Sequence, residues 1–335
     1  MTLVRERRQQ HGLRLSLLPQ VPSLELWLRW SSRFPVPVSV GPDSPGIESL
    51  ADLEKLVVLG HGNSGTIYKV RHRWSNSIYA LKVLRFSQDA IELHRQAACE
   101  AEILKRVDSQ YVVKCHGVLD NGTDVESGDL CFVMEYMEGG SLHDVVRVHG
   151  QLPEKDISNV AKRVLEGLKY LHEMQIVHRD IKPSNLLTNS RGEVKIADFG
   201  VSQVMASAHD TDNSCAGTCA YMSPERFDHY RWARGENEGF AGDVWSLGVA
   251  MLECYMGHFP LTAPGHRPDW ATLICAVCFS EPPEMETASP EFQNFVQCCL
   301  EKDWRRRATV QELLNHPFVT KCSTTTEELE EGLPG

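Results

Sequence analysis

The chain has 335 residues, 42% of them hydrophobic and 24% charged, a composition typical of a soluble globular protein with a sizeable core. Its formal net charge of −11 argues against a nucleic-acid binder, which would normally carry an overall basic surface. No run of about 18 consecutive apolar residues occurs, so we expect no membrane insertion. The eleven cysteines are irregularly spaced, which favours free thiols over a disulfide framework. We therefore expect the protein in a reducing compartment, the cytoplasm or also the nucleus.

In chain order, residues 1–48 are rich in Arg and Pro and poor in acids, which predicts a flexible extension. Alternating β-branched runs then predict strands at 56–59, 67–71, 78–84, 112–118 and 130–135, and helical spacing predicts a helix over 87–106. Helical spacing follows at 154–174, 242–256, 270–278, 290–301 and 309–315. A strand-rich part (53–136) before a helix-rich part (140–318) predicts an α+β fold with two lobes. We expect residues 319–335 to form an acidic, disordered tail.

A glycine-rich turn joins the first two predicted strands. Gly60, Gly62 and Gly65 form G-x-G-x-x-G, in which glycine lets the backbone approach phosphates closely and offer N–H donors. The pattern alone is weak, since it also opens dinucleotide-binding folds. Here the chain continues after Gly65 as a predicted strand, whereas a dinucleotide site would continue as a helix. The turn therefore favours a nucleotide phosphate site and excludes a nucleotide-binding oxidoreductase.

Lys82 lies on the next apolar strand, where a cation could reach the α- and β-phosphates of ATP. The predicted helix that follows offers Glu100 and Glu102 as partners. We select Glu100 by register and interpret Glu102 as a surface acid.

The strongest single motif spans residues 178–185 (HRDIKPSN). Asp180 can orient the substrate hydroxyl and accept its proton, and Asn185 can hold Mg²⁺. Lys182 can neutralise charge on the transferring phosphoryl group. Asp198, in Asp-Phe-Gly, supplies a second oxygen ligand of the kind that Mg²⁺ prefers. These motifs predict transfer of the ATP γ-phosphate to a protein hydroxyl.

With these motifs in fixed order, residues 53–318 resemble a eukaryotic protein kinase catalytic domain. The resemblance implies a small β-rich N-lobe with one main helix, a larger helical C-lobe, and ATP with Mg²⁺. It also implies that Asp243 braces the catalytic loop, and that Arg307 pairs with Glu225, which positions the protein substrate together with Thr218. It further places at the adenine a set of residues on the sheet and the hinge between the lobes: Ile67, Ala80, Met134, Glu135, Tyr136 and Met137.

Three segments restrict the resemblance to one family of protein kinases. Residues 217–226 (GTCAYMSPER), 109–117 (SQYVVKCHG) and 134–142 (MEYMEGGSL) are similar to the plant branch of the MAP kinase kinases. That family phosphorylates a Thr and a Tyr in the activation loop of a MAP kinase and is switched on by a MAP kinase kinase kinase. Lys182 agrees with a serine/threonine-type enzyme.

The N-terminal extension carries a second resemblance. A basic cluster with Arg7 and Arg8 precedes alternating leucines, Leu13 and Leu15. Such a peptide can place cations on an acidic patch and leucines in an adjacent groove, as a MAP kinase docking peptide does. An organellar transit peptide and an unremarkable tail stay open as alternatives.

The activation loop departs from the plant pattern of two phosphoacceptors. Ser214 fits the second position, but the first is Ala208, with Thr211 nearby as another candidate site. Asp210 could supply part of the missing charge, although one carboxylate is a poor substitute for phosphate. The chain thus resembles the divergent plant subgroup with incomplete activation sites. A kinase for other substrates and a non-catalytic pseudokinase scaffold stay open.

Overall fold

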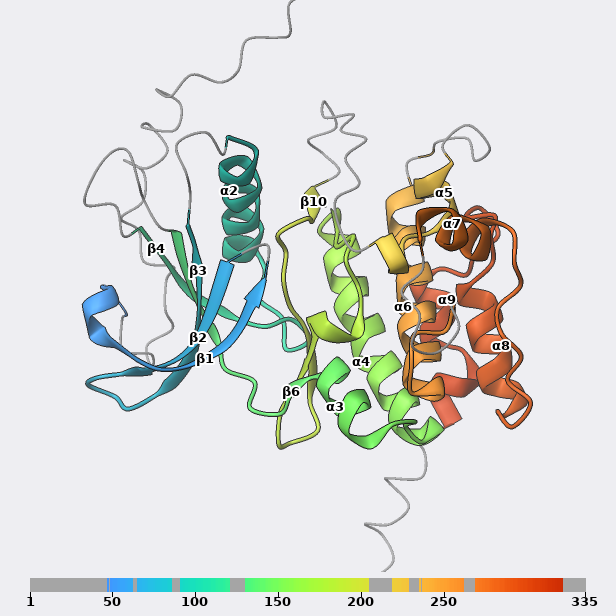
Figure 1. Ribbon diagram of the computed structural model, residues 1–335, viewed down its shortest axis with the longest axis horizontal. Helices are drawn as coiled ribbons and strands as arrows, with labels where there is room; N and C mark the ends of the chain where they lie inside the picture. The colour runs from blue at the N-terminus through green and yellow to red at the C-terminus, as the bar shows by residue number, and fades with distance from the viewer. Residues whose placement is uncertain are drawn as a thin grey trace, which may run out of the picture.

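A computed structural model describes residues 47, 49–62, 65–85, 91–120, 130–204, 219–228, 235, 237–261 and 269–321. The sites expected at Thr211, Ser214 and Thr218 lie outside these residues, as does the docking peptide with Arg7, Arg8, Leu13 and Leu15. Figure 1 shows two parts side by side: a sheet with one long helix, and a larger group of helices.

The first part is an antiparallel sheet in the order β1-β2-β3-β5-β4, with α2 beside it. Its elements are a 3₁₀ turn η1 (Leu50–Asp52), β1 (Leu53–Gly62), β2 (Gly65–His72), β3 (Ile78–Leu84), α2 (Ile91–Arg106), β4 (Cys115–Asp120) and β5 (Leu130–Glu135). One face of the sheet buries a small core that includes Val70, Leu81 and Val133. Because successive strand residues point to opposite faces, the alternate residues are left for the other face, which turns towards the helical part.

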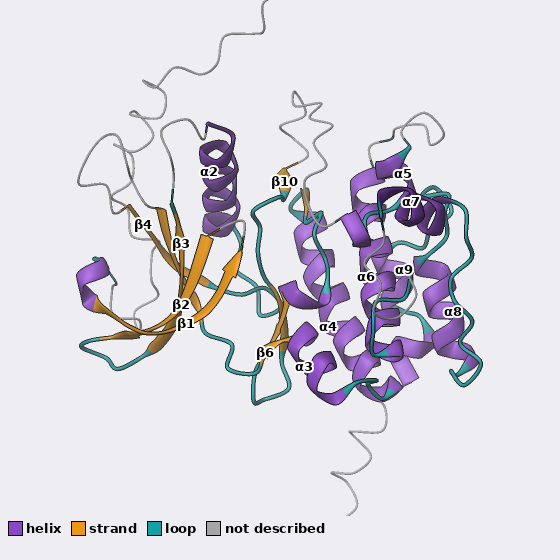
Figure 2. Ribbon diagram, in the orientation of Figure 1, coloured by secondary structure: helices purple, strands orange, loops and turns teal. Residues whose placement is uncertain are grey.

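The second part is helical (Figure 2). Its helices are α3 (Leu142–His149), α4 (Glu154–Glu173), α5 (Pro224–Phe227), α6 (Glu238–Met256), α7 (Trp270–Cys278), α8 (Pro290–Cys299) and α9 (Val310–Leu314). All residues of α6 from Asp243 to Cys254 are buried, as expected of a helix surrounded by others. Helices α4 and α8 pack against it.

The remaining described elements are short strands and 3₁₀ turns. They are β6 (Gly140–Ser141), β7 (Ile176–Val177), η2 (Pro183–Asn185), β8 (Leu186–Thr188), β9 (Val194–Ile196), β10 (Gln203–Val204) and η4 (Cys219–Tyr221). β6, β8 and β9 form one small sheet, and β7 pairs with β10. These pairings hold the catalytic motif and the Asp-Phe-Gly segment next to each other.

The predicted α+β bilobal kinase fold is confirmed, with local differences. The strand predicted at 112–118 begins at Cys115, because Val112 forms only an isolated bridge to Ile196. Helix α6 begins at Glu238 rather than at residue 242. Helix α3 was not predicted, although Ser141 and Asp144 form a capping box at its start.

The described helical chain continues to residue 321, and Val319 is buried. In α7, Cys278 is buried and Cys275 is exposed. Among the helices that the structure describes, none is long and apolar enough to cross a membrane.

Candidate active site

Lys82 on β3 lies between two carboxylates. Its Nζ is 2.6 Å from Oε1 of Glu100 and 2.8 Å from Oδ1 of Asp198. Helical spacing explains the choice of Glu100, because Ala97, Ala101 and Leu104 recur at this spacing and are buried, and Glu100 falls on the same face. Glu102 is exposed, so the choice made from the sequence is confirmed.

The charges of this triad are mutually dependent. Burial alone would lower the pKa of Lys82, but the Glu100 and Asp198 carboxylates outweigh it, so the pKa lies above its usual value. Burial opposes ionisation of Asp198 too, yet the Lys82 ammonium keeps its pKa below the usual range. The site therefore holds a fixed cation beside an ionised carboxylate, which suits phosphate on one side and a metal ion on the other.

The register of the sheet places the expected nucleotide-contacting side chains together. Ile67 pairs with Lys82, and Ala80 pairs with Met134, so these four side chains share the face that turns away from the small core. Gly65 adopts φ +118°, and a Cβ there would lie 2.2 Å from the Val83 carbonyl oxygen, so the position requires glycine.

The hinge follows β5. Among the described residues, none accepts a hydrogen bond from the amide of Met137, which leaves a donor for a nucleotide base. Both oxygens of Glu135 accept from Lys195 Nζ, at 2.7 and 2.8 Å. The ammonium of Lys69 lies 4.5 Å from the centre of the Tyr136 ring. The successive hinge side chains Glu135 and Tyr136 thus contact lysines of β9 and β2, respectively.

The catalytic motif is held by Asp243 of α6. Its carboxylate accepts from the amides of His178 (2.9 Å) and Arg179 (2.8 Å), which confirms the expected brace. Arg179 and Asp198 adopt φ of +69° and +66°, a conformation that costs energy for a residue with a side chain. These contacts impose the strained backbone that presents Asp180.

His178 is fully buried and serves as a neutral spacer. Its Nδ1 accepts from the amide of Asp180, and its Nε2 lies 3.2 Å from the Ala197 carbonyl, which together define the tautomer protonated at Nε2. Burial holds the pKa of His178 below its ordinary value, although Asp243 opposes this. The ring of Phe199 packs edge-on against it, with centroids 5.1 Å apart.

Asp180 and its neighbours form the reacting centre. Lys182 Nζ donates to Oδ2 of Asp180 at 2.7 Å. The amide nitrogen of Asn185 donates to the same oxygen and to the backbone carbonyl of Asp180, each at 2.9 Å. These bonds use the nitrogen of the Asn185 side chain, so its oxygen is available to a cation. Asn185 and Asp198 therefore supply the oxygen ligands that fit Mg²⁺.

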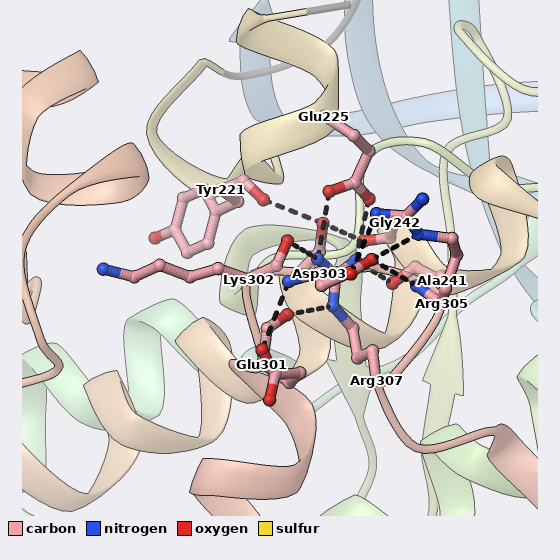
Figure 3. A network of polar contacts seen from close by, with 10 residues as sticks. Tyr221, Glu225, Ala241, Gly242, Glu301, Lys302, Asp303, Arg305 and Arg307 are labelled. Carbon is pink, nitrogen blue, oxygen red and sulfur yellow. Dashed lines mark hydrogen bonds and ion pairs between the residues drawn. The ribbon is translucent and has the colours of Figure 1, made fainter. Parts of the chain in front are cut away.

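Glu225 anchors the segment that follows the activation loop. Its carboxylate accepts from Arg307 Nη1 at 2.7 Å and from Nη2 at 3.0 Å, and both side chains are 0% exposed (Figure 3). Arg307 also donates to the carbonyls of Ala241 and Glu301, at 2.8 and 2.9 Å. The expected pair is confirmed as a wholly buried one.

The structure also shows contacts that we did not predict. Lys195 binds the hinge, His172 lies 2.9 Å from Asp243, and Tyr221 donates to Glu253 on α6. The alternation of β9 around buried Val194 and Ile196 marks Lys195 as facing the other way, but no local signal names its partner.

Comparison with known proteins agrees with the geometry. Residues 53–319 match the protein kinase domain. The chain is 52% identical to mitogen-activated protein kinase kinase 10 of Arabidopsis thaliana, over 95% of this chain and 99% of the relative. It is 51% identical to kinase kinase 9 and 49% to kinase kinase 7 of the same plant, with the same coverage. The chain is therefore a protein kinase and belongs to the plant branch of the MAP kinase kinases.

Proposed function

We propose that the chain is a catalytically active, dual-specificity kinase that phosphorylates both Thr and Tyr in the activation loop of a MAP kinase. The observation that carries this proposal is the position of Lys82, between Glu100 and Asp198 at 2.6 and 2.8 Å. A pseudokinase needs none of these contacts, whereas phosphoryl transfer needs all of them.

The site residues fall into a group that acts on ATP and a group that acts on the protein acceptor. Lys82 holds the α- and β-phosphates of ATP, and Asp180 orients the acceptor hydroxyl and accepts its proton. Lys182, hydrogen-bonded to Asp180, lies where it offsets charge on the transferring group. Asn185 and Asp198 would hold Mg²⁺, which would supply positive charge to neutralise the phosphates.

The acceptor and the activator are inferred from kinship and sequence. The named relatives are MAP kinase kinases, which supports a MAP kinase as substrate and a MAP kinase kinase kinase as activator. The basic and leucine-bearing peptide with Arg7, Arg8, Leu13 and Leu15 would dock that substrate. Ser214 would receive the activating phosphate, in a cascade that runs in the cytoplasm and reaches the nucleus.

The test uses the full-length chain, Mg-ATP and a panel of intact, catalytically dead MAP kinases. We expect phosphate on both the Thr and the Tyr of at least one activation loop, detected by mass spectrometry and lost with Asp198→Ala. Ser214→Ala, with and without an upstream kinase, shows whether that residue is the switch.

Two further measurements distinguish this function from a kinase of other specificity and from a non-catalytic scaffold. Replacing Arg7 and Arg8 with Ala should weaken transfer to an intact MAP kinase while transfer to a short peptide is unchanged. Transfer to generic substrates alone would favour a kinase of other specificity. No transfer to any acceptor after upstream activation, with ATP binding intact, would favour the scaffold.

A further inference from the structure

A mostly buried ion pair joins two sheets of the molecule at the hinge. Glu135 is the last residue of β5 in the five-stranded sheet, and Lys195 is the middle residue of β9 in the small sheet β6-β8-β9. Nζ of Lys195 lies 2.7 and 2.8 Å from the two carboxylate oxygens of Glu135. The Lys195 side chain is 11% exposed and that of Glu135 is 22% exposed, so water screens this pair less than an ion pair on the surface. The pair therefore holds the end of β5 against β9.

Glu135 is also held by the residue that precedes β4. The Lys114 amide donates to Oε2 of Glu135 at 3.2 Å, and the Glu135 amide donates to the Lys114 carbonyl at 2.8 Å. Met137 follows two residues after Glu135, and its amide has no acceptor within the described part of the chain. Because two residues span at most about 7 Å, fixing Glu135 limits where the Met137 amide can lie. The Lys195 contact thus acts on the hinge group that is left for a nucleotide base.

The chain after Lys195 leads directly to the metal side of the site. Asp198, one of the two expected Mg²⁺ ligands, comes three residues after Lys195. Between them, Ile196 is buried, and the Ala197 amide donates to the carbonyl of the other expected ligand, Asn185, at 2.9 Å. An extended stretch that is hydrogen-bonded in this way opens rarely. β9 is therefore a stiff connection between the hinge and the metal ligands, and the catalytic steps described above do not use Lys195.

We propose that Lys195 is a positioning residue for the adenine of ATP. Through Glu135 it holds the hinge at a set distance from β9, and therefore from Asn185 and Asp198. The base and the phosphates of one ATP molecule then meet groups that are already at the right separation, so binding requires less ordering of the protein. The inference concerns ATP and does not depend on which protein accepts the phosphate. The alternative is an ion pair that stabilises the fold and has no effect specific to the base.

The test measures binding to the full-length chain by isothermal titration calorimetry, with ATP, adenosine and inorganic tripolyphosphate as probes, the two phosphates in the presence of Mg²⁺. In Lys195→Met, Glu135 loses the charge-assisted bonds to both of its oxygens. We expect the Kd for ATP and the Kd for adenosine each to rise by about five- to thirtyfold. Tripolyphosphate carries no base, so its Kd should stay within about twofold of wild type. An unchanged Kd for adenosine, or equal weakening of adenosine and tripolyphosphate, would overturn the proposal.

Two control variants accompany Lys195→Met. Lys195→Arg should recover most of the adenosine affinity, because a guanidinium can bind both oxygens of one carboxylate. Arg191→Met removes an ion pair from the turn of the same hairpin, in which Arg191 lies 2.7 Å from Glu193 but is 72% exposed. It should match wild type with all three probes, and a loss of adenosine affinity equal to that in Lys195→Met would contradict a role specific to the hinge.

Glu135→Gln tests the same contact from its other side and keeps the proposal testable if Lys195→Met does not fold. Its side chain keeps the shape and one acceptor oxygen but loses the charge. We expect a smaller rise in the Kd for adenosine than in Lys195→Met, again without a change for tripolyphosphate. The double variant should lose no more adenosine affinity than Lys195→Met alone, and fully additive losses would show that the two residues act independently of each other.

Hydrogen exchange gives a readout that needs neither nucleotide nor activity. Amides of the hinge, residues 135–137, should exchange at least about tenfold faster in Lys195→Met, while those of the catalytic loop, residues 178–185, keep their protection. Equal protection of the hinge in both proteins would refute the positioning role even if the wild type phosphorylates MAP kinases. Faster hinge exchange with weaker adenosine binding, in a chain that phosphorylates nothing, would instead support the positioning role and reject the proposed function.

Discussion

Replacing Arg307 with Met should destabilise the protein severely, because it leaves a buried charge without a partner. The Glu225 carboxylate, 0% exposed, would lose both of its guanidinium bonds. The Ala241 and Glu301 carbonyls would each lose a donor. Breaking a buried ion pair by removing one partner typically costs about 3–5 kcal/mol, and this pair has no access to water that would reduce the cost.

The assay is urea unfolding followed by far-ultraviolet circular dichroism, which reports mainly on the helical part. Arg305→Met is the matched control, since Arg305 also makes two bonds to one carboxylate, that of Asp303, but its side chain is 52% exposed. An exposed pair of this kind contributes little, because solvent screens the two charges. The double variant Arg307→Met with Glu225→Leu removes both charges, so it should be more stable than Arg307→Met alone.

Equal unfolding free energies for Arg307→Met and Arg305→Met would refute this reasoning, because burial would then make no difference. A double variant as unstable as the sum of its single variants would show that packing rather than charge dominates the cost.

Three further predictions concern the catalytic side. Lys82→Met should abolish phosphoryl transfer while circular dichroism stays native, and residual turnover near the wild-type rate would contradict the role of its ammonium. Gly65→Ala should lower the melting temperature, since its Cβ would meet the Val83 carbonyl at 2.2 Å, whereas Gly60→Ala, with open space around its Cβ, should change it little. Because burial lowers the pKa of His178, the unfolded chain takes up a proton below about pH 6.5 that the folded protein does not. Stability should therefore fall as the pH drops through that value and fall less in His178→Phe, and identical pH profiles in urea unfolding would exclude a buried neutral imidazole.

The features that the sequence predicted well are those set by local spacing. Lys82 and Glu100 could be paired in advance, because strand alternation and helical register decide which face each occupies. The contacts that escaped prediction join residues far apart in the chain with no motif between them. Glu135 and Lys195 meet only because β9 packs below the hinge, and Tyr221 reaches Glu253 only because α6 is buried beside it. Such pairs depend on tertiary packing, which periodicity does not encode.

The engaged hinge side chains have a consequence for inhibitors of this kinase. A compound seeking the Glu135 carboxylate must displace Lys195, which binds both of its oxygens. The Tyr136 ring is already covered by the Lys69 ammonium. Adenine mimics therefore meet the hinge mainly through its backbone groups. Selectivity has to come from the apolar side chains on the sheet face above it, Met134 and the partly exposed Ile67.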